Sequence, residues 1–260
     1  MGEISIETRR GIRCRVRESG EGEPLLYLHG LAGLLPEEPL LDRLSTRYRV
    51  LAPVWPGFGE EGGEDRLEDM GDFTLHGWDV LEALELERPH LVGHSLGGMI
   101  AAEMAAVNSA GLGRLALLAP LGLWMDEHPI PDIFGVTPMK VPGLLFDDAQ
   151  QGQMLLSGGL DFSDNQALTD FMVANARRLG TAGKILFPIP NRRLSKRLYR
   201  LTAPTLLVWG ALDRLLPAEY AARWRELVPQ AQLTEVEGAA HMLPLEQPEA
   251  VAKALQDFLG

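Results

Sequence analysis

The chain has 260 residues, of which 46% are apolar and 23% are charged, values typical of folded globular proteins rather than disordered or fibrous ones. Its 36 acidic and 24 basic residues give a formal net charge of -12, which disfavours nucleic acid and anionic membrane surfaces as partners. This length accommodates one large domain, or such a domain with an insertion, and nothing in the composition requires a partner for folding or indicates an oligomeric state.

The first residues contain neither the basic nor the apolar region of a secretory signal, and no apolar run is long enough to span a bilayer. Gly2 is not followed by a serine or threonine at position 6, so myristoylation is disfavoured. We therefore expect a cytoplasmic protein.

Cys14, the single cysteine, cannot form an internal disulfide, and we expect it to be a small buried residue without a chemical role.

Residues 4–17 alternate apolar and polar side chains around Arg10-Gly11, which predicts an antiparallel hairpin at one edge of a sheet. Short apolar runs, typical of strands buried on both faces, follow at 25–28, 50–52, 91–92, 115–118 and 205–209. Segments with helical periodicity occupy 67–86, 96–107, 218–227 and 248–259. The alternation predicts an α/β fold with a mostly parallel central sheet flanked by helices.

The alternation of strands and helices stops between residues 121 and 201, a segment rich in Pro, Met, Phe and Gly with weak helical periodicity around 164–179. A structureless loop of this length would be improbable in a compact domain, so we expect several short helices. The sequence thus predicts a core formed by residues 1–120 and 202–260, with 121–201 inserted after the sixth strand.

The end of this insertion carries a cluster of basic residues. Its members are Arg192, Arg193, Lys196, Arg197 and Arg200. Their spacing favours the solvated face of a short helix over a binding patch.

Ser95 lies in Gly93-His94-Ser95-Leu96-Gly97, between an apolar strand pattern and a helix pattern of small residues. In such a strand, sharp turn and helix, a larger side chain at Gly93 or Gly97 would collide with the neighbouring backbone, and the serine hydroxyl is left at the tip. A serine hydroxyl becomes a good nucleophile only when a base takes its proton and an acid orients that base.

Both partners are present later in the chain. Asp213 follows the expected strand at 205–209, and His241 follows an expected strand at 232–236. Ser95, Asp213 and His241 therefore all lie beyond the carboxyl ends of strands, at the edge where open α/β sheets bind ligands.

The order Ser, Asp, His, together with the serine motif, His29-Gly30 after the strand at 25–28 and the tail at 241–249, resembles the α/β-hydrolase family. The resemblance covers roughly the first 120 and the last 60 residues. It implies an α/β-hydrolase fold in which the inserted segment 121–201 is a helical cap, or lid.

The resemblance also implies a role for each site residue. Ser95 would be the nucleophile, His241 the general base and then the general acid, and Asp213 the carboxylate that orients the imidazole. The backbone N–H groups of Leu31 and Leu96 would form the oxyanion hole. The reaction would need no cofactor.

The chain departs from the family in one turn. Related chains usually have Asp-x-Pro-Gly-x-Gly, whereas here the turn reads Val54-Trp55-Pro56-Gly57-Phe58-Gly59, which leaves its local hydrogen bonding open.

The remaining histidines indicate no metal site. His29 matches a structural position of the family, and His94, beside the expected nucleophile, is expected to be a packing residue. His76, His90 and His128 have no partners at the spacing of metal ligands, so we expect no metal.

The inserted segment is rich in large apolar residues, and pockets for small molecules are lined mainly by such side chains. We expect some of these residues to contact a small-molecule substrate. The candidates are Trp124, Met125, Phe134, Phe146 and Phe187, with Met242 beside the expected catalytic histidine.

These observations favour a serine hydrolase that cleaves a carboxylic ester of a small to medium, largely apolar substrate through an acyl-enzyme. Two alternatives stay open: hydrolysis of a carbon–carbon bond in a vinylogous diketone, and a hydrolase-like receptor that binds a ligand without turnover. The carbon–carbon hydrolases usually have tryptophan where this chain has Met242. Ser95 argues against haloalkane dehalogenases and epoxide hydrolases, whose nucleophile is an aspartate. The physiological substrate is not indicated.

Overall fold

A computed structural model describes residues 2–161, 163–187 and 193–260. Eight strands form one sheet in the order β1-β2-β4-β3-β5-β6-β7-β8, in which β1 and β2 are antiparallel to their neighbours and the other pairs are parallel. The strands are β1 Gly2–Glu7, β2 Arg13–Ser19, β3 Glu23–Leu28, β4 Tyr48–Pro53, β5 His90–His94, β6 Leu115–Leu118, β7 Thr205–Gly210 and β8 Gln232–Val236. The predicted hairpin and every predicted strand are present.

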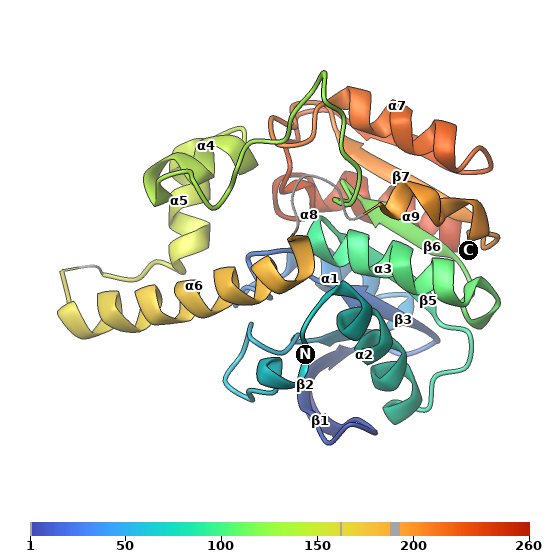
Figure 1. The fold of residues 1–260 in the computed structure, drawn as a ribbon, viewed down its shortest axis with the longest axis horizontal. Coiled ribbons are helices and arrows are strands. Elements are labelled where there is room, and N and C mark those ends of the chain that lie inside the picture. Colours follow the sequence, from blue (N-terminus) through green and yellow to red (C-terminus); the bar gives the residue numbers. More distant parts are fainter. Residues whose placement is uncertain (1, 162, 188–192) are drawn as a thin grey trace.

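Helices cover both faces of the sheet, as Figure 1 shows. Helix α2 packs on α3, and α1 packs on α9. The helices of this layer structure are α1 Pro39–Leu44, α2 Met70–Ala83, α3 Leu96–Val107, α7 Ala218–Leu227, α8 Leu243–Glu246 and α9 Pro248–Leu259. The mostly parallel sheet flanked by helices confirms the predicted fold class.

The strands β3, β5, β6 and β7 are almost entirely buried because helices cover them on both sides, which is why their sequences are continuously apolar. The exposed β1 at the sheet edge alternates instead. Burial of the central strands holds the carboxyl ends of β5 and β7 in place, and β8 pairs with β7 at the edge of the sheet. The predicted site residues follow these three strands.

The segment between β6 and β7 is mostly helical. It contains η3 Pro138–Lys140, α4 Val141–Leu145, α5 Ala149–Ser157, α6 Asn165–Leu186, η4 Leu194–Lys196 and η5 Leu198–Arg200. In Figure 1 the amino-terminal half of α6 stands out from the sheet and its flanking helices. Helix α6 continues beyond the predicted periodicity of 164–179, to residue 186.

Polar contacts fasten the carboxyl-terminal half of α6 to the core. Arg177 forms an ion pair with Glu64 and donates to the carbonyl oxygen of Gly59 at 2.7 Å. Lys184 Nζ donates to the carbonyl oxygens of Glu64 and Leu67 at 2.6 and 3.0 Å. These contacts hold one end of the insertion on the loop that follows β4.

The basic cluster is not simply a solvated face. Arg197 pairs with Glu103, whose side chain is buried in the middle of α3, and Arg200 Nε donates to the carbonyl oxygen of Ala106 at 2.6 Å. Arg192 lies outside the described residues. A buried carboxylate on α3 needs a cationic partner, so these arginines anchor residues 194–200 to that helix.

In the described ranges, every helix is too short or too polar to cross a bilayer. Cys14 is buried in β2, as expected, and burial raises the pKa of its thiol to about 12.

Candidate active site

Ser95 occupies the sharp turn between β5 and α3. Its backbone has φ +54° and ψ -113°, a conformation that costs an L-residue on the order of 1–3 kcal/mol. Two backbone hydrogen bonds maintain it: Ser95 N donates to Leu118 O at 2.9 Å, and Leu121 N donates to Ser95 O at 3.1 Å. The turn is thus held by β6 and by the first residues after that strand.

The glycines beside Ser95 are required for close packing, as predicted. A Cβ atom on Gly97 would lie 2.1 Å from the carbonyl oxygen of Leu28, and one on Gly93 would lie 2.5 Å from that of Gly97. Because the obstructing atoms belong to the backbone, they cannot move aside. The two glycines allow β3, β5 and α3 to approach one another around the serine.

The three predicted site residues form one hydrogen-bonded chain. Nε2 of His241 lies 2.8 Å from Ser95 Oγ, and Nδ1 of His241 lies 2.8 Å from Oδ2 of Asp213. All three residues are buried, with 4%, 1% and 8% of Ser95, His241 and Asp213 exposed. This geometry allows the serine proton to pass to Nε2 while Nδ1–H donates to the carboxylate.

The second carboxylate oxygen of Asp213 is also occupied. Oδ1 accepts hydrogen bonds from the backbone N–H groups of Leu215 and Leu216 at 2.9 and 2.8 Å. These two donors fix the plane of the carboxylate, so that Oδ2 remains directed at the imidazole.

Two further histidines, His94 and His29, stabilise the backbone around the hydrogen-bonded residues. Nε2 of His94 donates to the carbonyl oxygen of His241 at 2.9 Å, and Nδ1 of His29 donates to the carbonyl oxygen of Gly30 at 2.8 Å. Burial lowers the pKa of His94 to about 3 and that of His29 to about 4. Both rings are therefore neutral at physiological pH and act in the described structure as fixed supports.

The loop after β3 lies directly against the serine. A Cβ atom on Gly30 would be 3.2 Å from Cβ of Ser95. Among the described residues, none accepts a hydrogen bond from the backbone N–H of Leu31 or Leu96. Both N–H groups thus have no acceptor within the described residues, and Leu96 directly follows Ser95 in the chain.

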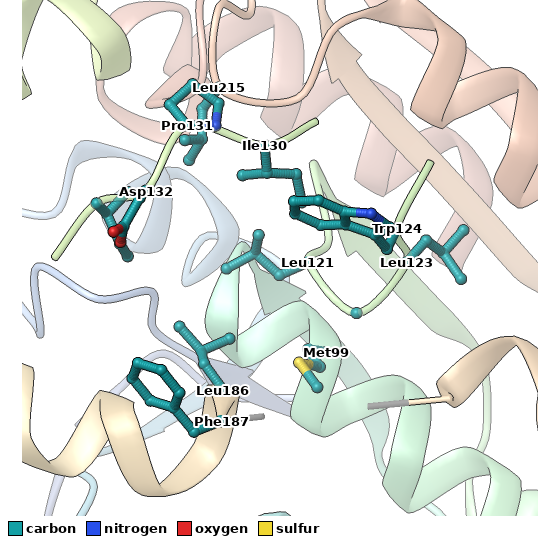
Figure 2. Close-up of a pocket in the computed structure, with 12 residues that line it drawn as sticks. Met99, Leu121, Leu123, Trp124, Ile130, Pro131, Asp132, Leu186, Phe187 and Leu215 are labelled. Carbon is teal, nitrogen blue, oxygen red and sulfur yellow. The ribbon is translucent and has the colours of Figure 1, made fainter. Parts of the chain in front are cut away.

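A cavity of about 230 Å³ lies beside the site, and Figure 2 shows side chains from several segments around it. Leu121, which bonds to Ser95, and Leu215, which bonds to Asp213, both line it. Of the predicted contact residues, Trp124 and Phe187 also line it. The other lining residues are Met99, Gly122, Leu123, Ile130, Pro131, Asp132, Ile133 and Leu186.

Four predicted contact residues lie elsewhere. Phe146 is 1% exposed and packs against Gly152 of α5. The ring of Phe134 contacts that of Phe187, with centroids 5.3 Å apart and an angle of 40° between the ring planes. Met125 packs on the core. Met242 lines a separate cavity of about 10 Å³, beside His94.

The aliphatic lining residues were not predicted. Their place in the sequence, rather than the size of their side chains, would have identified them. Leu121 and Leu215 follow the carboxyl ends of β6 and β7 by only a few residues.

The model of the alpha/beta hydrolase family matches residues 25–254, which include the whole hydrogen-bonded chain. The chain belongs to the alpha/beta hydrolase family. It is therefore a hydrolase of this family, in agreement with the resemblance of its serine motif.

Curated relatives are similar to this chain over nearly its whole length. The 2-hydroxy-6-oxo-2,4-heptadienoate hydrolase of Pseudomonas putida is 25% identical, over 96% of this chain and 94% of that protein. The 2-hydroxy-6-oxo-6-phenylhexa-2,4-dienoate hydrolase of Burkholderia cepacia is 27% identical, over 95% and 91%. Among solved structures, a membrane phospholipase A is 25% identical with a TM-score of 0.81, over 99% of this chain and 85% of that one.

Proposed function

We propose that this alpha/beta hydrolase is a carboxylesterase acting on small to medium, uncharged and largely apolar esters through an acyl-enzyme. The observation that carries the proposal is the buried chain from Ser95 through His241 to Asp213, with both hydrogen bonds at 2.8 Å beside an apolar cavity. A nucleophile, a base and an orienting acid in this geometry are the elements of acyl transfer.

In the proposed reaction, Ser95 Oγ attacks the ester carbonyl while Nε2 of His241 takes the hydroxyl proton. The imidazolium then gives this proton to the leaving alcohol oxygen as the carbon–oxygen bond of the ester breaks. A water molecule next loses a proton to Nε2 and attacks the carbonyl carbon of the acyl-serine. The bond between this carbon and Ser95 Oγ then breaks, Nε2 returns the proton to Oγ, and the carboxylic acid leaves. Asp213 holds the imidazole and stabilises its charged form throughout.

The N–H groups of Leu31 and Leu96 are the proposed oxyanion donors, each able to contribute about 3 to 4 kcal/mol to the transition state. Leu96 is also the first residue of the 12-residue helix α3. The positive end of the helix dipole favours negative charge at this position.

The cavity supports the choice of substrate class. Among its described lining residues, Asp132 alone carries a charge, and the rest are apolar apart from the glycine and the indole N–H of Trp124. A carboxylate on the substrate would meet a like charge here with no cation in the lining to offset it. Uncharged esters therefore fit this lining better.

A second candidate is carbon–carbon bond hydrolysis of a dienoate, the activity in the names of the curated relatives. One observation favours it: Arg178 donates to the carbonyl oxygen of Ala32, next to Leu31, while its buried Nε has no partner among the described residues. A cation at that loop could attract a substrate carboxylate. Met242, which replaces the tryptophan expected in such enzymes, argues against it.

The two candidates are separated by measuring kcat/KM for a neutral ester series and for a 2-hydroxy-6-oxo-dienoate in parallel. We expect the best ester to exceed the dienoate by at least about 100-fold. The opposite order would replace the esterase proposal with the second candidate. Absence of turnover with both, in folded protein, would favour a ligand-binding receptor.

A further inference from the structure

A short segment of the insertion is bonded to the loops that carry Asp213 and His241. This segment, Gly143 to Asp147, includes the end of α4 and the turn into α5. We refer to it as the clamp segment. None of its residues lines the 230 Å³ cavity, and none belongs to the hydrogen-bonded chain of Ser95, His241 and Asp213.

Arg214, the residue after Asp213, makes the first connection. Its Nη1 donates to the carbonyl oxygens of Gly143 and Phe146 at 3.2 and 3.0 Å, and its Nη2 lies 2.9 Å from Oδ1 of Asp147. The planar guanidinium therefore contacts three positions of the clamp segment at once, a geometry that lysine cannot reproduce.

Glu246 in α8 makes the second connection. Its Oε2 accepts from the backbone N–H of Ala240 at 2.9 Å, and its Oε1 accepts from the backbone N–H of Asp147 at 2.7 Å. The backbone N–H of Met242 donates in turn to the carbonyl oxygen of Leu145 at 3.0 Å. Both neighbours of His241 are thus held in this network, one through Glu246 and one directly.

We propose that Arg214 and Glu246 are positioning residues, which use the clamp segment to keep the Asp213 loop and the His241 loop at a fixed separation. The inference rests on the proposed function of Ser95, Asp213 and His241. These loops follow different strands, β7 and β8, and the clamp segment bridges them from outside the sheet. Small displacements of a catalytic base are costly to the chemical step, so a bridge of this kind matters for rate rather than for binding.

The test compares Arg214→Ala and Glu246→Ala with Arg197→Ala as a matched control. Arg197 also anchors part of the insertion to the core, but through Glu103 on α3, away from both loops. For a neutral ester, we expect the first two variants to lose about 10- to 100-fold in kcat with KM within about twofold, the scale expected when a reacting group is misplaced by up to about 1 Å. The control should keep kcat within about twofold while its thermal midpoint falls.

Conservative variants distinguish a loss of positioning from a loss of folding. Glu246→Gln presents an amide nitrogen to one of the two N–H donors, and Arg214→Lys keeps the charge without the fork. We expect both to have kcat values between those of the wild type and the alanine variants. Equal kcat in wild type, alanine variants and control, with only the thermal midpoint changed, would overturn the proposal and leave a purely structural anchor.

A readout without turnover separates this proposal from the proposed function. The Nδ1 proton shared by His241 and Asp213 can be observed by proton NMR as a downfield resonance. We expect it to shift or broaden in Glu246→Ala and Arg214→Ala and to stay unchanged in Arg197→Ala, whether or not an ester is hydrolysed. An unchanged resonance in all three variants would contradict the positioning role, and failure of the wild type to hydrolyse any ester would contradict only the proposed function.

Discussion

The backbone N–H of Trp55 donates to Nε2 of His29 at 3.2 Å. Trp55 lies in the turn where relatives usually have an aspartate one residue earlier, at the position of Val54. The backbone of the turn, rather than a carboxylate, thus secures the loop that precedes Leu31. Since an acceptor nitrogen must be unprotonated, this bond also requires His29 to be neutral.

His29 is one of three buried histidines whose neutrality predicts acid sensitivity. Burial lowers the pKa of His29 and His76 to about 4 and that of His94 to about 3, all from 6.5. Above pH 6.5 these groups are neutral in both the folded and the unfolded chain. Below it the unfolded chain binds protons first, so the free energy of unfolding falls as the pH drops from 6.5 towards 4.

His76 offers the cleanest test, because neither ring nitrogen has a partner among the described residues and the ring packs on Trp55. The lowered pKa of His76 corresponds to a decrease of about 3 kcal/mol in the free energy of unfolding by pH 4, since each pKa unit is equivalent to about 1.4 kcal/mol. We expect His76→Leu to flatten the dependence of the thermal midpoint on pH between 6.5 and 4. Parallel curves for the variant and the wild type would refute this origin of the acid sensitivity.

Close packing around the serine predicts that Gly97→Ala is severely destabilising. The added methyl group would lie 2.1 Å from the carbonyl oxygen of Leu28, so β3 and α3 must separate. We expect the free energy of unfolding, measured by urea denaturation, to fall by about 3 kcal/mol, the upper end of the usual cost of overpacking a core.

Gly180→Ala is the matched control for this substitution. Gly180 is exposed in α6, and a Cβ atom there meets nothing within 4 Å. Alanine should stabilise the helix by up to about 1 kcal/mol. Equal effects of the two substitutions would contradict the packing described for the turn.

The cavity predicts a change of substrate range in Trp124→Ala. The indole of Trp124 lines the cavity, and its Nε1 donates to Asp126 at 2.8 Å. Removing it enlarges the site, so the ratio of kcat/KM for an octanoate ester to that for an acetate ester should rise by about 10-fold, the scale expected for apolar pocket contacts. Leu75→Ala, at an exposed position of α2, should leave this ratio unchanged. A ratio that responds equally in both variants would exclude Trp124 from the substrate site.

The sequence was sufficient to predict the sheet, the helices that flank it and the positions of Ser95, Asp213 and His241. Apolar runs reveal buried strands, and in a parallel sheet the residues after such strands meet at one edge. Helix α1 was not predicted because it has only six residues, too few to establish a periodicity.

The lining of the cavity was predicted only in part, for a different reason. Phe146 and Phe187 are alike as sequence signals, yet Phe146 fills the space above Gly152 whereas Phe187 faces the cavity. Which large apolar side chain packs against a helix and which contacts open space is decided by tertiary packing. Likewise, Arg197 was expected in solvent because its partner Glu103 lies 94 residues earlier in the chain.

The central claim is that Ser95 is the nucleophile of an acyl-transfer reaction. Its most direct test is intact-mass measurement after incubation with a serine-directed phosphonate, combined with ester turnover, for the wild type and Ser95→Ala. The wild type should gain one adduct on Ser95, and Ser95→Ala should gain none and lose at least about 1,000-fold in kcat, with a nearly unchanged thermal midpoint. Retained turnover in Ser95→Ala, or an adduct on another residue, would contradict the claim.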